Sequence, residues 1–475
     1  MTFNSLIFLV FAAIFFPLYF ATRGTLRIWV CLIASYIFYG WWDYRFLALI
    51  GASTLVDYAI GRLMYATADP WKRKLLIIVT VVVNLSFLGF FKYFNFFIDS
   101  FHQMSNALGL GFSPSTLEIT LPIGISFYTF MSMSYTIDVY RNELPAEKSL
   151  LKFATFIAFF PHLVAGPILR ARDLLPQLHG HHRLHRPRVI IGLALILMGF
   201  FKKVGVADSA ALVVDKIFDN PAVHSSMGLL VGVVLYAFQI YCDFSGYSDI
   251  AIGLALVMGV NFIENFRTPY ISKNFSEFWS RWHISLSTWL RDYLYIPLGG
   301  NRNGTFNTYR NLLLTMLLGG LWHGADWKFV IWGALHGLYL VFQRLIGKRW
   351  DRLRKSLHVP NFINNAFLIA LVFSLTCLAW VFFRADSTGD ALHIIHRLFT
   401  FEDFTLGSVR NKLLVAKVAL LIGILLAIEA ADRRFDMEAL LLKSTGFRIV
   451  AFATLLWLIA LFGTFGSSTF IYFQF

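Results

Sequence analysis

The sequence predicts an all-α integral membrane protein that crosses the bilayer several times. Hydrophobic residues make up 57% of its 475 residues, and charged residues make up only 14%. A soluble domain carries about 25% charged residues, so this chain has too few charges to cover a surface in water. The mean hydropathy is +0.64. Apolar runs of about 20 residues recur, which is the length that a helix needs to cross the hydrocarbon core.

These apolar runs predict helices along the whole chain. The expected ranges are 4–22, 28–43, 46–66, 75–98, 119–138, 150–167, 189–210, 226–258, 311–322, 327–345, 362–384, 413–431 and 447–466. Some of these runs are too short to cross alone, so we expect about eleven transmembrane helices plus re-entrant pieces. No polar linker is long enough to separate domains, and residues 1–475 are expected to form one membrane-embedded domain.

The first helix is expected to be retained in the membrane. Its apolar run has no basic residues before it, and Arg23 and Arg27 follow it. A cleaved signal peptide has the opposite order, with a basic region ahead of a shorter apolar run.

Positive charge is concentrated in short loops between the apolar runs. The net charge of +14 would favour nucleic-acid binding in a soluble protein. Here it indicates topology instead, because basic loops stay on the cytoplasmic side. We therefore expect the basic loops 170–188 and 344–355 on the cytoplasmic face and the N-terminus outside. The expected surroundings are membrane lipid, with no nucleic-acid partner.

No metal site is expected. Cys31, Cys242 and Cys377 each lie in an apolar stretch and form no CxxC pair, so they are typical of small buried hydrophobic residues. A run of histidines at 179–185 alternates with arginines that would repel a cation, which favours a solvated loop.

The stretch 271–304 interrupts the apolar pattern. It is rich in charge, yet its aromatic and aliphatic residues recur every three or four positions. That spacing predicts an amphipathic helix at the membrane interface or dipping into the protein. Pro297 and the Gly299–Gly300 pair are expected to end it.

His323 is the strongest candidate for chemistry. It ends a short apolar run that suggests a re-entrant helix, and another apolar run follows it. An ionisable group at membrane depth is costly and indicates a functional site. Histidine also suits general-base catalysis, because its ordinary pKa of about 6.5 lies near neutrality. The alternative is a buried histidine that bonds to a backbone carbonyl.

His283 is the second candidate, within the amphipathic stretch. It would orient the substrate, hold a carbonyl oxygen, or bond structurally to a neighbour. Arg291 lies eight residues later, about two helical turns, which would place it on the same helix face as His283. Asp292 is nine residues away, so the pair does not match the spacing of four that soluble glycerolipid acyltransferases use.

Polar residues also interrupt the long apolar run at 226–258. Asp243 and Ser245 would supply an acceptor and a hydroxyl at membrane depth, either lining a tunnel or satisfying the basic residues of 271–304. No nucleotide-binding loop or HExxH motif is visible.

Two sequence blocks resemble one known family. Residues 278–293 are similar to the first histidine motif of the membrane-bound O-acyltransferases, and residues 321–325 are similar to the second. Residues 122–127 and 243–249 resemble the bacterial branch, which acetylates exported polysaccharides. The likeness covers nearly the whole chain, and neither histidine departs from the pattern.

The resemblance implies a fold and a site. The family fold is a ring of tilted helices around a central tunnel. His323 would be the catalytic histidine and His283 the second active-site residue. Substrate or donor contacts would come from residues near the two motifs and the polar insertion: Trp282, Arg291, Asp292, Trp322, Asp243 and Ser245.

The resemblance also implies an activity in the bacterial inner membrane. The chain would be an O-acetyltransferase with no tightly bound cofactor, and acetyl-CoA or an acetylated carrier would be the cytoplasmic donor. The acetyl group would pass to a periplasmic acetyltransferase, another acetyl-accepting partner, or directly to a polysaccharide. Alginate is the first expectation, with cellulose or another exopolysaccharide as the alternative. From another class, the rivals are a transporter and a scaffold for an acetylation complex.

Overall fold

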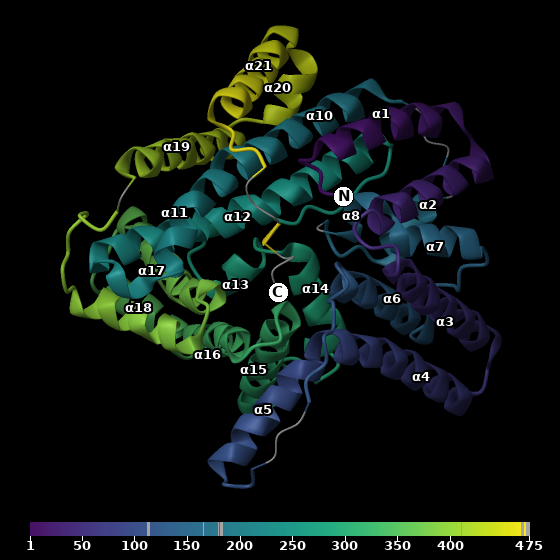
Figure 1. Cartoon of the computed structure of the whole chain (residues 1–475), viewed down its shortest axis with the longest axis horizontal. Helices are drawn as coiled ribbons and strands as arrows, with labels where there is room; N and C mark the ends of the chain where they lie inside the picture. Colours follow the sequence, from purple (N-terminus) through teal and green to yellow (C-terminus); the bar gives the residue numbers. More distant parts are fainter. Residues whose placement is uncertain are drawn as a thin grey trace. The chain divides into compact units, whose positions relative to one another are not determined.

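The computed structural model is built from helices. It describes residues 1–111, 115–164, 166–178, 180, 184–409, 411–466 and 470–471. Every regular element among these residues is a helix, as Figure 1 shows. The all-α prediction is confirmed for this part of the chain. The histidines at 179, 181 and 182, which we assigned to a solvated loop, lie outside the described residues.

Eight described helices are long and apolar enough to cross a membrane. They are Phe46–Ala66, Pro70–Ala107, Arg186–Phe218, Ser226–Val257, Trp327–Ser356, Asn361–Arg384, Lys412–Arg434 and Thr445–Phe462. The two N-terminal apolar helices, Leu6–Ala21 and Gly24–Gly40, are shorter. Several crossings are thus supported, whereas the predicted number of about eleven is not confirmed.

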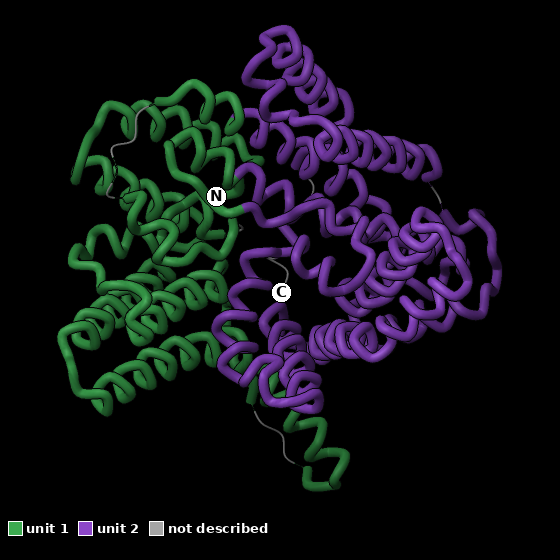
Figure 2. The backbone as a smooth tube through the Cα atoms, turned by 180° about the vertical axis from the view of Figure 1, so that it is seen from behind, with its two compact units in different colours: residues 1–192, 251–263 green, residues 193–250, 264–475 purple. Residues whose placement is uncertain are grey.

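The described chain divides into two units, coloured separately in Figure 2. Unit 1 comprises Met1–Gly192 and Ala251–Ile263, and unit 2 comprises Leu193–Ile250 and Glu264–Phe475. The prediction of one membrane-embedded domain remains a prediction.

Unit 1 holds the N-terminal helices. They are α1 (Leu6–Ala21), α2 (Gly24–Gly40), α3 (Phe46–Ala66), α4 (Pro70–Leu88), η1 (Gly89–Tyr93), α5 (Phe94–Ala107), α6 (Ile125–Tyr140), α7 (Leu150–Ala158), α8 (Phe160–Leu163), α9 (Ala171–Leu178) and the start of α10 (Arg186–Phe200). Within it, α3 packs against α4 and α6. Asp57 of α3 is fully buried and accepts hydrogen bonds from Thr80, Asn84 and Ser132. These bonds compensate a carboxylate that would otherwise be costly to bury.

Unit 2 holds the remaining helices. They are the rest of α10, η2 (Phe201–Ala207), α11 (Asp208–Phe218), η3 (Pro221–Val223), most of α12 (Ser226–Val257), η4 (Pro269–Ile271), α13 (Phe275–Trp279), α14 (Ile284–Leu290), η5 (Arg291–Tyr295), α15 (Gly304–His323), α16 (Trp327–Ser356), α17 (Asn361–Arg384), α18 (Thr388–Thr400), α19 (Lys412–Arg434), α20 (Met437–Lys443) and α21 (Thr445–Phe462).

A buried ion-pair cluster joins helices of unit 2. The Lys203 ammonium of η2 lies 2.8 Å from Asp208 Oδ1 and 2.6 Å from Asp243 Oδ1 of α12. Its neighbour Lys202 pairs with Asp249, also on α12, at 2.7 Å. The π-helical turn η2 thus directs two successive lysines to carboxylates of one helix. Such a turn is a local departure from the regular helix that often marks functional sites.

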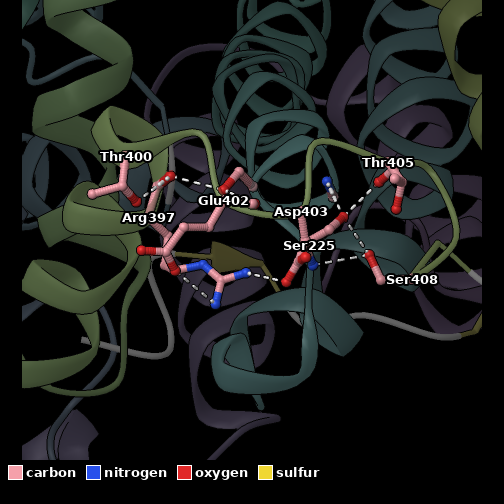
Figure 3. A network of polar contacts seen from close by, with 9 residues as sticks. Ser225, Arg397, Thr400, Glu402, Asp403, Thr405 and Ser408 are labelled. Carbon is pink, nitrogen blue, oxygen red and sulfur yellow. Dashed lines mark hydrogen bonds and ion pairs between the residues drawn. The ribbon is translucent and has the colours of Figure 1, made fainter.

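A second polar network in unit 2 fixes the connection between α18 and α19 (Figure 3). Arg397 of α18 lies 3.7 Å from the Glu402 carboxylate and 3.5 Å from that of Asp403. The backbone N–H of Ser225, just before α12, donates to Ser408 Oγ at 3.1 Å. These contacts tie the loop after α18 to the start of α12.

The predicted continuous helix over 271–304 is wrong. The segment forms a short helix, α13, and after a turn a second helix, α14, which continues directly into the π-helical η5. Residues 280–283 separate α13 from α14, and His283, the last of them, has a left-handed backbone with φ 43° and ψ 54°. The apolar spacing of three and four was therefore a correct local signal, but it did not extend through the break.

The re-entrant helix predicted at 311–322 is longer than expected. It begins at Gly304, runs for 20 residues as α15 and ends at His323. It packs along α16, which starts four residues later.

Candidate active site

The hairpin of α15 and α16 positions His323. An added Cβ at Gly320 would overlap the backbone carbonyl oxygen of Phe329, and one at Gly333 would overlap that of Met316. The two helices therefore approach closely only because these positions are glycines. Asp326 ends the short turn by capping α16, where it accepts a hydrogen bond from the Lys328 backbone at 2.9 Å.

His323 lies inside an aromatic shell. His323 is buried, with only 3% of its surface exposed. Its ring centroid is 5.0 Å from Trp322, 5.0 Å from Trp332 and 5.4 Å from Phe383, each in an edge-to-face arrangement. The last residue of a helix is thus held among rings rather than in water.

His283 approaches His323 from the turn between α13 and α14. The two ring centroids are 6.5 Å apart, and Trp322 lies 6.0 Å from His283. Phe244 of α12 packs edge-on against His283 at 4.6 Å. The structure therefore brings both predicted histidines and Trp322 together, although 40 positions separate the histidines in the sequence.

The backbone of His283 is strained. A left-handed conformation is uncommon outside glycine and costs of order 1–3 kcal/mol. Asn265 holds it in place. The Asn265 carbonyl accepts from the Ile284 N–H at 2.9 Å, and its side-chain Oδ1 accepts from the Ser285 N–H at 3.2 Å. Strain that is compensated in this way is frequent at functional sites.

Asn265 also fixes the tautomer of His283. Its Oδ1 must be the amide oxygen, because a backbone N–H donates to it. This oxygen lies 3.3 Å from His283 Nδ1, so Nδ1 carries the proton and donates. The Nδ2 of Asn265 donates to Ser248 Oγ of α12 at 3.1 Å, and this bond sets the orientation of the Asn265 amide. Nε2 of His283 then holds the lone pair and can accept a hydrogen bond.

Burial keeps His283 neutral. The residue lies outside the candidate spans, and burial lowers the pKa of its imidazole to about 3. A neutral ring with its lone pair on Nε2 suits an acceptor that orients a hydroxyl. It is a poor hydrogen-bond donor for an oxyanion, because its one N–H is directed at Asn265.

Trp282 is buried beside this site. Its residue is 1% exposed, and its ring lies 5.1 Å from Phe266 and 5.0 Å from Trp380. Trp282 thus belongs to the aromatic packing that supports the His283 turn.

Arg291 and Asp292 differ from the other candidates. The Arg291 side chain is 59% exposed, and its Nε lies 2.6 Å from Asp292 Oδ1. His283 is the residue before α14, and Arg291 follows α14 directly as the first residue of η5, so the shared helix face with His283 stays a prediction. The contact of Arg291 and Asp292 with substrate or donor remains a prediction.

Asp243 and Ser245 lie on α12. Asp243 pairs with Lys203, and its Oδ2 accepts from the Ile471 N–H at 2.7 Å. The expectation that it would neutralise the basic residues of 271–304 is therefore not what the structure shows. Ser245 is fully buried, and its Oγ has no hydrogen-bond partner in the described part of the chain. Their role toward a substrate stays a prediction.

The sequence did not identify Asn265, Lys203 or Trp332. Asn265 lies 18 positions before His283, and Trp332 lies nine positions after His323. A lone asparagine in a short polar stretch carries no local signal. Within the described residues, no group of three or more His, Cys, Asp or Glu side chains is arranged to hold a metal ion.

Comparison with known proteins supports one family. Residues 37–382 match the membrane-bound O-acyltransferase family, MBOAT. The chain is 47% identical to the "Probable alginate O-acetylase AlgI" of Pseudomonas putida, over 89% of this chain and 85% of that protein. It is 45% identical to the protein of the same name from Pseudomonas aeruginosa, over 86% of this chain and 77% of that one.

A relative of lower identity is named for a different acetyl acceptor. The chain is 36% identical to the "Peptidoglycan O-acetyltransferase" of Helicobacter pylori, over 78% of this chain and 73% of that protein. The match of the family to most of the chain, together with these identities, leads to one conclusion. The chain belongs to the membrane-bound O-acyltransferase family and is a multi-pass membrane acyltransferase.

Proposed function

We propose that this protein is an O-acetyltransferase of the bacterial inner membrane that serves the acetylation of an exported polysaccharide, with alginate as the acceptor. The observation that carries the chemical part is the pair of buried histidines with ring centroids 6.5 Å apart. The relatives named alginate O-acetylase, at 45–47% identity, favour alginate over peptidoglycan, whose named relative is 36% identical. Cellulose or another exopolysaccharide is the alternative acceptor.

In the proposed reaction, His323 acts as the general base. An acceptor hydroxyl oxygen attacks the carbonyl carbon of an acetyl thioester while His323 takes the hydroxyl proton. The C–O bond forms, the C–S bond breaks, and the imidazolium returns the proton to the leaving thiolate. A positioned base contributes about 10²–10⁴-fold in rate.

His283 orients the acceptor. Because the attacking hydroxyl donates its one proton to His323, the Nε2 of His283, which holds the lone pair, accepts a hydrogen bond from a second hydroxyl of the sugar or from the N–H of His323. Because its pKa is lowered to about 3, it stays neutral through the working pH range and does not compete for the transferred proton.

The donor in this proposal is acetyl-CoA or an acetylated carrier on the cytoplasmic side. The end of α16 carries Lys348, Arg349, Arg352 and Lys355, all exposed. Such a basic surface would attract the phosphates of coenzyme A. The same charges also suit the cytoplasmic topology, which they would favour without any donor. A periplasmic acetyltransferase or other acetyl-accepting protein would receive the group outside.

A transfer assay tests the proposal. Purified full-length protein in proteoliposomes is given radiolabelled acetyl-CoA and an alginate acceptor, for wild type and His323→Ala. We expect transfer by the wild type and loss of about 10²-fold or more in the variant. His396→Ala, which replaces an exposed histidine of α18, is the matched control and should transfer normally.

The outcomes separate the rivals. Equal transfer by wild type and His323→Ala would remove His323 from the chemistry and favour a scaffold. Passage of intact donor or polysaccharide across the bilayer without acetyl transfer would favour a transporter. Transfer to cellulose but not to alginate would correct the acceptor alone.

A further inference from the structure

Three rings, of Trp279, Trp332 and His336, form a cluster next to His323. Trp279 ends α13, and Trp332 and His336 lie four residues apart on one face of α16. Their ring centroids are 5.1 Å apart for Trp279–His336, 4.8 Å for Trp332–His336 and 5.8 Å for Trp279–Trp332. Each ring therefore contacts the other two.

The nitrogens of this cluster are buried without partners. The indole nitrogens of Trp279 and Trp332 and both ring nitrogens of His336 have no hydrogen-bond partner among the described residues. Trp332 is 1% exposed and His336 is fully buried. Buried polar atoms are almost always satisfied in native proteins, so each such nitrogen calls for a bound group.

The hydrogen-bonding character of the cluster defines that group. An indole nitrogen can only donate, and a neutral imidazole has one donor and one acceptor. The cluster thus has an excess of N–H donors, and the remaining rings around His336 are neutral as well: Phe275, Phe278, Tyr339 and Trp380. A neutral oxygen acceptor fits this environment, whereas an anion would lose its hydration without gaining a cation.

The position of the cluster indicates which hydrogen-bond acceptor it contacts. Trp332, a member of the cluster, also packs edge-on against His323 at 5.0 Å. His283 directs its N–H at Asn265, so the donors for a carbonyl must come from elsewhere. A thioester donor carries carbonyl oxygens at its acetyl group and in the amides of its arm.

We propose that Trp279, Trp332 and His336 form a hydrogen-bond-donor site for carbonyl oxygens of a thioester acyl donor, beside His323. This inference rests on the proposed acetyl transfer and specifies how its donor is held. The three residues bind the donor and take no proton from it.

A binding experiment tests the site apart from the chemistry. Full-length protein in nanodiscs is titrated with acetyl-CoA and, separately, with CoA, and the Kd is measured for wild type, Trp332→Phe, Trp279→Phe and His336→Phe. Each substitution keeps a ring and removes the N–H donors. We expect each to weaken acetyl-CoA binding about 3- to 10-fold, the effect of one lost hydrogen bond.

Trp350→Phe is the matched control. It makes the same substitution on the same helix, but its indole N–H already donates to Asn364 Oδ1 at 3.0 Å. Its Kd for acetyl-CoA should equal that of the wild type. Using three separate variants keeps the test valid if one of them fails to fold.

Each outcome decides the proposal. Weaker binding of acetyl-CoA alone supports a site for the acetyl carbonyl, and equal weakening of acetyl-CoA and CoA supports a site for the amides of the arm. Unchanged Kd in the folded variants, or no binding of acetyl-CoA to the wild type, overturns the proposal and leaves a buried water as the occupant. Acetyl transfer measured in the same preparations, with His323→Ala alongside, reports separately on the proposed function.

Discussion

Replacing Asn265 by alanine removes the side-chain amide that sets the tautomer of His283 and that accepts one of the two hydrogen bonds holding its backbone. Three donors lie near its Oδ1: Ser285 Oγ at 2.9 Å, the Ser285 N–H at 3.2 Å and His283 Nδ1 at 3.3 Å. A buried donor left without a partner costs about 1–3 kcal/mol, and water entering the space recovers part of this. We expect Asn265→Ala to lower the free energy of unfolding by about 2–4 kcal/mol.

The effect on catalysis follows from the lost orientation. The hydrogen bonds from the Ser285 N–H and from His283 Nδ1 act on the His283 turn. At about 1 kcal/mol each, their loss removes about 2 kcal/mol of transition-state stabilisation. That corresponds to a fall of about 30-fold in kcat, with a smaller change in the KM for the donor. Acetyl transfer in proteoliposomes measures both constants.

A second substitution at the same position gives a pH readout. In Asn265→Asp, a carboxylate faces His283 and favours its charged form, so the pKa of His283 rises above about 3. The acid limb of the transfer rate should therefore move to higher pH. A purely structural role for Asn265 would lower activity at every pH without moving this limb.

Asn364→Ala is the control for this prediction. Asn364 is also buried, and its Oδ1 accepts one hydrogen bond from Trp350, so its loss costs stability alone. Wild-type kcat in Asn265→Ala, or an equal fall of kcat in Asn265→Ala and Asn364→Ala, would refute the argument that Asn265 orients His283.

Three further predictions concern stability, measured by thermal or denaturant unfolding of the purified protein in detergent. Burial lowers the pKa of His283 to about 3, so between about pH 6.5 and 3 the unfolded chain binds a proton that the folded chain does not. The free energy of unfolding should therefore fall as the pH drops from about 6.5 towards 3. His283→Asn should reduce this fall. Gly320→Ala should destabilise by about 1–3 kcal/mol or more, because its Cβ meets backbone of α16, whereas Gly347→Ala, which meets nothing within 4 Å, should be neutral or stabilising. Lys203→Met leaves two buried carboxylates unpaired and should lower the free energy of unfolding by about 3–5 kcal/mol. Arg267→Met breaks only an exposed ion pair and should lower it by at most about 1 kcal/mol. Equal losses within either pair of variants would contradict the packing or burial argument behind it.

The candidate site could be predicted only in part from the sequence. His323 and His283 each stand in a block of residues with recognisable local order, so both were found. Asn265, which sets the tautomer of His283, and Trp332, which packs on His323, belong to other segments. Their roles depend on contacts that no spacing along the chain encodes.

The sequence by itself determined the class of the protein. The length and apolar character of its runs dictate membrane helices, because each run must satisfy its backbone within the bilayer. It also determined the family, through two histidine blocks in order. These are local properties, since a helix depends on residues a few positions apart.

Only the tertiary structure decided how the site is built. The left-handed backbone of His283 ended the amphipathic helix that periodicity predicts, because hydrogen bonds to Asn265 stabilise a conformation that the local sequence disfavours. Likewise, Asp243 pairs with Lys203, 40 positions away, rather than with the basic residues of 271–304. Such pairings are selected by packing across helices, and the free energy that fixes them comes from burial rather than from neighbours along the chain.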